Sequence, residues 1–101
     1  MPGTAYLLEA HQRLTDTVDN PRFRLTLAAQ QFWAATFHEE SWPPDLRQRA
    51  ATLVLRFLSR GTISDTISAM GDQEVVQATA ELHAFIHAFQ AWKRQNPAGL
   101  P

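Results

Sequence analysis

The sequence has no cysteine, which excludes disulfide bonds and thiolate zinc sites. Lys93 is the only lysine among nine basic residues, and ten acidic residues bring the net charge to −1 at pH 7. Proteins that bind nucleic acid usually carry a surplus of basic charge, so nucleic acid is not the expected partner. No apolar run approaches the roughly 18–20 residues that span a bilayer, and no secretion signal is visible at the N-terminus. We therefore expect a cytoplasmic protein that makes no membrane contact.

Patterns that support catalysis are also missing. The sequence has no G-x-S-x-G motif and no recognisable set of serine, histidine and acid for nucleophilic catalysis. Glycine occurs only singly, so no glycine-rich loop is available to hold a phosphate group. We therefore expect no catalytic residues, no cofactor and no enzymatic activity.

The clearest positive pattern is a helix over residues 43–60. Pro43 suits the first helical position, Asp45 favours the first turn through the helix dipole, and Gly61 suits the position after the end. The helix length matches the width of a small domain, so we expect this to be the central helix. Its apolar stripe at helical spacing consists of Leu46, Ala50, Leu53, Val54 and Phe57.

Helix start signals recur along the rest of the chain. Asn20-Pro21 is a turn followed by a first helical proline, Thr62 and Asp65 resemble a capping box, and Asp72 is a suitable N-cap. Apolar residues at helical spacing follow each signal. The helices expected besides 43–60 cover residues of about 4–18, 21–39, 62–70 and 73–95.

The combined pattern predicts the fold class. No sustained alternation of apolar and polar residues and no Asn-Gly or Asp-Gly turn suggests a strand. The links between the expected helices are short, which favours antiparallel neighbours. We predict one all-α domain over residues 1–101, a compact antiparallel bundle of four long helices and one short helix, with residues 96–101 as a frayed tail.

The helix expected over 21–39 is apolar around most of its circumference. One stripe is formed by Leu25, Ala28, Ala29, Phe32 and Ala35, while Phe23, Leu27, Trp33 and Phe37 lie beside or across from it. Such a helix is either central to a bundle or exposes an apolar patch to a partner.

Further residues favour contact with a protein partner. Trp42 stands in a short connection before Pro43-Pro44, so its side chain either folds back over a helix end or remains available as an anchor. Arginine, the dominant basic residue, suits ion pairs at interfaces. We predict a small non-enzymatic adaptor, regulator or chaperone whose partner is another protein or a second copy in a homodimer. The expected contact residues are Phe37, Trp42, Arg47 and Arg49.

Three arginines line one side of the helix expected over 43–60. Arg49, Arg56 and Arg60 lie at i, i+7 and i+11. They are either a clamp for an acidic partner or phosphate, or they are solvated or paired with acids on neighbouring helices.

An alternative function rests on His83 and His87. Their i, i+4 spacing places two imidazoles on one helix face, a geometry that a zinc or nickel site can use. The glutamate of an H-E-x-x-H motif is absent, because Ala84 follows His83. A third ligand from His11, His38 or Glu81 requires that the fold bring it close. The alternatives are therefore a metal-binding or metal-sensing protein and two histidines at the edge of the core.

The span around residues 25–58 carries a short series of motifs. These are Trp33 in an aromatic helix, the acids Glu39 and Glu40, and the helix start Pro44-Asp45-Leu46-Arg47, with Ala5-Tyr6 and Asn20-Pro21-Arg22 upstream. In these motifs the chain resembles the flagellar biosynthesis regulator FlaF family. The break after the acids is shorter here than in that family, and its closing Ile-Asn run is absent. The resemblance implies a small cytoplasmic helical protein without enzymatic activity that contacts other proteins in flagellin synthesis or export.

Overall fold

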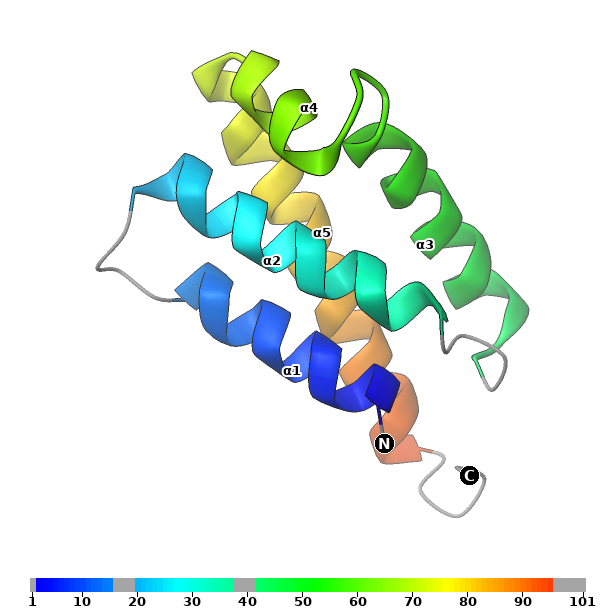
Figure 1. Ribbon diagram of the computed structural model, residues 1–101. Helices are drawn as coiled ribbons and strands as arrows, with labels where there is room; N and C mark the ends of the chain where they lie inside the picture. Colours follow the sequence, from blue (N-terminus) through cyan, green and yellow to red (C-terminus); the bar gives the residue numbers. More distant parts are fainter. Residues whose placement is uncertain (1, 16–19, 38–41, 96–101) are drawn as a thin grey trace.

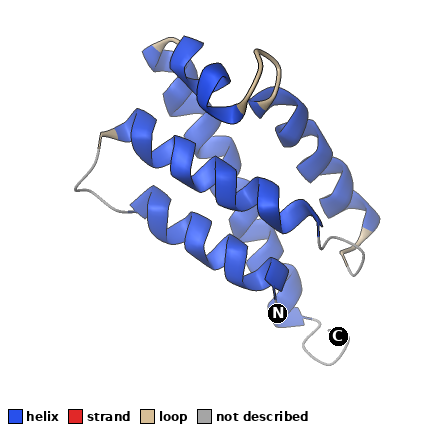
Figure 2. Cartoon of the chain, viewed as in Figure 1, coloured by secondary structure: helices blue, strands red, loops and turns tan. Residues whose placement is uncertain are grey.

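A computed structural model describes residues 2–15, 20–37 and 42–95, and all regular structure within these ranges is helical (Figures 1 and 2). The five helices are α1 (Pro2–Thr15), α2 (Pro21–Ala35), α3 (Pro44–Phe57), α4 (Ile63–Ala69) and α5 (Asp72–Gln95). The predicted all-α class, with four long helices and one short one, is confirmed. No helix in the described part of the chain combines the length and the apolar character needed to cross a membrane.

The helices pack around α2 and α5. α1 and α2 lie side by side and run in opposite directions, and α5 crosses behind them (Figure 1). α2 also packs against α4 and α5, whereas α3 lies to one side and packs mainly against α4 and α5. The expectation that the helix after Pro43 would be central was therefore wrong. Its apolar stripe is narrow, whereas that of α5 is long enough to serve several neighbours.

The sequence signals predicted the starts of α2, α3 and α4 to within one residue. The Asn20 side chain accepts a hydrogen bond from the Phe23 amide at 2.8 Å, so α2 begins at Pro21 as predicted. Thr62 and Asp65 form the predicted capping box at the start of α4. α3 begins at Pro44, one residue later than expected. Pro43 is its N-cap in an extended conformation, because the residue before a proline is disfavoured in helical geometry.

The helix ends are less well predicted. α2 ends at Ala35, followed by a single turn over residues 36–37, and α3 ends at Phe57, three residues early. Between α3 and α4, Gly61 has φ +117°, which an L side chain rarely adopts, so a glycine is required there. Residues 16–18 of the first predicted helix, residues 38–39 of the second and the predicted tail 96–101 lie outside the described residues.

The core is formed where the predicted apolar stripes meet. Phe32 of α2 packs edge-on against Phe57 of α3 and Phe85 of α5, with ring centroids 6.5 and 5.3 Å apart. Trp42 extends this cluster toward the end of α5, where its ring lies 5.3 Å from that of Phe89. All five residues of the stripe predicted for α2 are fully buried.

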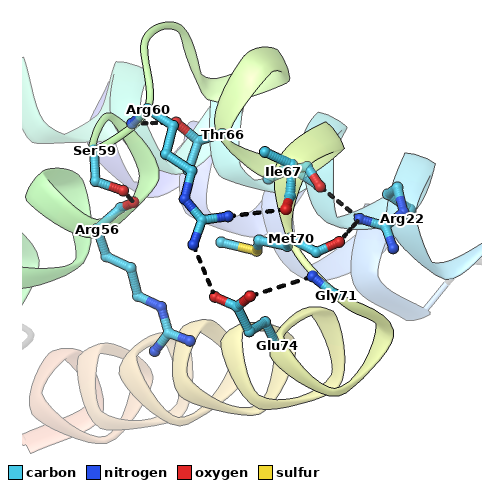
Figure 3. A network of polar contacts seen from close by, with 10 residues as sticks. Arg22, Arg56, Ser59, Arg60, Thr66, Ile67, Met70, Gly71 and Glu74 are labelled. Atoms are coloured by element: carbon cyan, nitrogen blue, oxygen red, sulfur yellow. Dashed lines mark hydrogen bonds and ion pairs between the residues drawn. The ribbon is translucent and has the colours of Figure 1, made fainter.

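Arg22 of α2 holds the end of the short helix α4. Its guanidinium donates hydrogen bonds to the carbonyl oxygens of Ile67 and Met70 at 2.6 and 2.7 Å (Figure 3). It also pairs with Asp72 at 2.9 Å. A positive charge at a helix C-terminus is favoured by the helix dipole, so α4 is fixed against α2.

Arg60 reaches the same end of α4 from the α3–α4 connection. It donates to the carbonyl oxygen of Ala69 at 2.9 Å and pairs with Glu74 at 3.4 Å. Glu74 in turn accepts a hydrogen bond from the Gly71 amide (Figure 3). The turn between α4 and α5 is thus stabilised from both sides.

Candidate functional site

Three large aromatic side chains are exposed along α2 and the turn that follows it. Phe23 is 47% exposed, Trp33 40% and Phe37 65%. They lie beside or across from the buried stripe of the helix, and the rings of Trp33 and Phe37 are 5.5 Å apart. We call Phe23, Trp33 and Phe37 the α2 aromatic face. Phe37 is one of the contact residues predicted from the sequence. Phe23 and Trp33 were not predicted as contacts, although the sequence places them beside or across from the apolar stripe, which is the signal that could have identified them.

Two adjoining grooves run beside this face between α2 and α4. The first, of about 450 Å³, extends under Trp33 to the α3–α4 connection and has only uncharged side chains in its lining. The second, of about 400 Å³, continues past Phe23. Gln30 and Ser64 belong to both grooves. An apolar side chain is therefore the type of group that the first groove accommodates.

Trp42 does not belong to this exposed surface. It is only 4% exposed, and its ring packs against Phe85 at 5.8 Å and Phe89 at 5.3 Å. Of the two alternatives for this tryptophan, the structure shows the buried one. The extended Pro43 directs the chain so that the preceding side chain covers α5, and the prediction of Trp42 as an exposed contact residue was wrong.

The arginines of α3 and of the α3–α4 connection differ in their contacts within the described part of the chain. Arg47 and Arg49 are exposed, and Arg49 lines a groove between α3 and α5 rather than the grooves beside α2. Arg56 forms an ion pair with Glu81, and Arg60 pairs with Glu74. Intramolecular pairing, one of the alternatives for Arg49, Arg56 and Arg60, is therefore confirmed for Arg56 and Arg60. These two side chains are not available to bind an acidic partner.

A second cluster joins His11 of α1 to His83 and His87 of α5. The ring centroids lie 5.4 Å apart for His11 and His83, 6.2 Å for His11 and His87, and 4.4 Å for His83 and His87. One ring nitrogen of each residue lies within 4.8 Å of those of the other two. His11 and His83 are half-buried and His87 is exposed, so the cluster opens to solvent.

The packing of α1 explains this cluster. Leu7 and Ala10 are buried, and Lys93 of α5 donates a hydrogen bond to the Thr4 hydroxyl at 2.9 Å. These contacts lay α1 along α5, which brings His11 to the pair predicted from the sequence. Of the other third ligands considered, Glu81 pairs with Arg56, and His38 lies outside the described residues.

The environment favours the neutral form of His83. Burial lowers the pKa of this imidazole below its ordinary value, and the neighbouring His87 and His11 lower it further. A neutral imidazole retains a nitrogen lone pair, which is the form that binds metal ions.

The lowered pKa predicts a pH dependence of stability in the metal-free protein. Below about pH 6.5 the unfolded chain binds a proton at His83 more readily than the folded chain does. The free energy of unfolding should therefore fall as the pH is lowered from about 7.5 to 5.5. Urea denaturation with a chelator present measures it, and His83→Asn should make the fall shallower. An identical pH profile in that variant would contradict the prediction.

Comparison of the chain with known protein families, with curated proteins and with solved structures finds no match. The assignment of function therefore depends on the surfaces just described, the α2 aromatic face and the histidine cluster.

Proposed function

We propose that this protein is a small non-enzymatic regulator or adaptor of the cytoplasm that acts by binding another protein through the α2 aromatic face. One observation carries the proposal: three aromatic side chains are exposed along α2 and the turn after it, beside grooves with a largely uncharged lining. No catalytic constellation in the sequence competes with this function.

The arrangement of exposed apolar residues supports this choice. Single exposed apolar side chains are normal on a protein surface. Leu55 on α3 and Val76 on α5 are such cases. Three exposed aromatic residues on one helix and the turn after it, two of them with rings in contact, are different, because aromatic anchors supply much of the binding energy at protein interfaces.

The chemistry of the face defines its partner. The groove under Trp33 has no charged residue in its lining, and the arginines Arg56 and Arg60 are already paired within the chain. The proposed partner surface is therefore apolar rather than acidic. The resemblance to the FlaF family adds flagellin, or a protein of its synthesis or export, as a specific candidate to test.

A second copy of the chain would satisfy the same requirement. In a homodimer the α2 aromatic face would pack against its counterpart, with one patch used on both subunits. Sedimentation of the purified protein at several concentrations separates this homodimer from a monomer that binds a different protein.

The test of the proposal uses Phe37→Asp, which places a charge at the end of the α2 aromatic face, next to Trp33. Leu55→Asp is the matched control, because Leu55 is 73% exposed on another helix. A partner is first isolated from native extract or supplied as purified flagellin, and its affinity is then measured by calorimetry. We expect Phe37→Asp to weaken binding, or self-association, about 30-fold or more, which corresponds to roughly 2 kcal/mol.

The control should stay within about threefold of the unchanged protein, since a solitary exposed leucine contributes little to binding. Equal loss in both variants, or unchanged binding in Phe37→Asp, would contradict the proposal. Circular dichroism confirms that both variants remain folded.

A further inference from the structure

We infer that His11, His83 and His87 form a binding site for a divalent transition-metal ion that suits imidazole ligands, with Zn²⁺ as the expected ion. Imidazole nitrogens bind zinc, nickel and copper, and three protein ligands with one solvent position are a common zinc arrangement. This site is separate from the α2 aromatic face and does not depend on the protein partner proposed there.

The geometry is close to that of a three-histidine site. A tetrahedral zinc ion with ligand bonds of about 2.0–2.1 Å requires nitrogens about 3.4 Å apart. The three ring nitrogens already lie within 4.8 Å of one another. Side-chain rotations that move the ring nitrogens by about an ångström would therefore bring them to ligand distance, without movement of a helix.

The surroundings leave the imidazoles available. Within the described part of the chain, the imidazole side chains of His11, His83 and His87 form no hydrogen bond or ion pair; the hydrogen bond that His11 accepts from Thr15 goes to its backbone carbonyl oxygen. Three basic groups close together repel one another once they are protonated. A single metal ion would instead bind the lone pairs of all three neutral imidazoles. Metal binding therefore avoids the repulsion that protonation of the three residues would cause.

The ligands come from opposite ends of the sequence. His11 belongs to α1, whereas His83 and His87 belong to α5, so a bound ion would link these two helices directly. Without it, α1 and α5 are already joined by the hydrogen bond from Lys93 to Thr4, to which the ion would add a second connection. Metal binding should therefore stabilise the fold and hold α1 on α5.

The test titrates Zn²⁺ into the full chain, prepared without a histidine tag and freed of metal by chelation. Calorimetry should give one site per chain, and excess zinc should raise the unfolding temperature by about 10 °C or more at 100 times the Kd. Hydrogen exchange of α1 should slow on addition of zinc. Co²⁺ should give the visible spectrum of a tetrahedral site, which reports coordination independently of stability.

The variants identify the ligands. His11→Gln and His83→Gln should each weaken binding at least tenfold, and His38→Gln, which removes the remaining histidine, should leave it within about threefold. Circular dichroism confirms folding, and His11→Ala serves if the glutamine itself coordinates. Absence of heat and of a thermal shift with Zn²⁺, Ni²⁺ and Cu²⁺ would overturn the inference. A loss in His38→Gln as large as that in His11→Gln would overturn the assigned ligand set.

Discussion

Replacing Trp42 with alanine is expected to lower the free energy of unfolding by about 3–5 kcal/mol, the usual cost of truncating a core aromatic residue. Trp42 is 4% exposed and packs against both Phe85 and Phe89, so its removal leaves a cavity beside α5. In a domain of this size the unfolding temperature should fall by about 15–30 °C. Urea denaturation and calorimetry measure both quantities.

Trp33→Ala is the matched control for this prediction. Trp33 is 40% exposed and lies on the α2 aromatic face, so its loss should cost about 1 kcal/mol or less. Losses of similar size in the two variants would contradict the assignment of one tryptophan to the core and the other to the surface.

Replacing Arg22 with methionine is expected to destabilise the protein by about 1.5–3 kcal/mol, because hydrogen bonds from a charged donor are worth more than neutral ones. The substitution retains an apolar stem of similar length but removes the donors to the carbonyl oxygens of Ile67 and Met70. The end of α4 should loosen first, which hydrogen exchange at residues 63–70 measures alongside urea denaturation.

Asp72→Asn separates the carbonyl contacts from the ion pair. The Asp72 side chain is fully exposed, and exposed ion pairs contribute little, so this variant should destabilise the protein clearly less than Arg22→Met does. If Asp72→Asn destabilises the protein as much as Arg22→Met, the ion pair and not the helix end is the important contact.

Structural features that depend only on a few neighbouring residues were predictable from the sequence. The Asn20 cap before Pro21 and the capping box of Thr62 and Asp65 each depend on groups three residues apart or fewer, and both are present. The apolar stripes were also predicted correctly, because helical spacing alone decides which side chains share a face. Prediction was weaker at helix ends, such as that of α3, where tertiary contacts and the Gly61 turn decide the last residue.

Features that depend on distant residues were not predictable. The position of Trp42 depends on how α5 passes the start of α3, and the sequence left both alternatives open. His11 joins His83 only because α1 packs along α5, although the i, i+4 pair itself was visible. Arg22 has no local signal for its role, since its partners Ile67 and Met70 lie 45 and 48 residues away.

The measurement that tests the proposed function most directly is site-specific photo-crosslinking in cells that naturally contain the protein. A photoreactive phenylalanine analogue is placed at position 37 or 23 on the α2 aromatic face, and at position 55 on α3 as the control. The account predicts a discrete crosslinked protein, or a crosslinked dimer, at 37 and 23 and none at 55. Equal crosslinking at 55, or no crosslinking at 37 and 23, would contradict it.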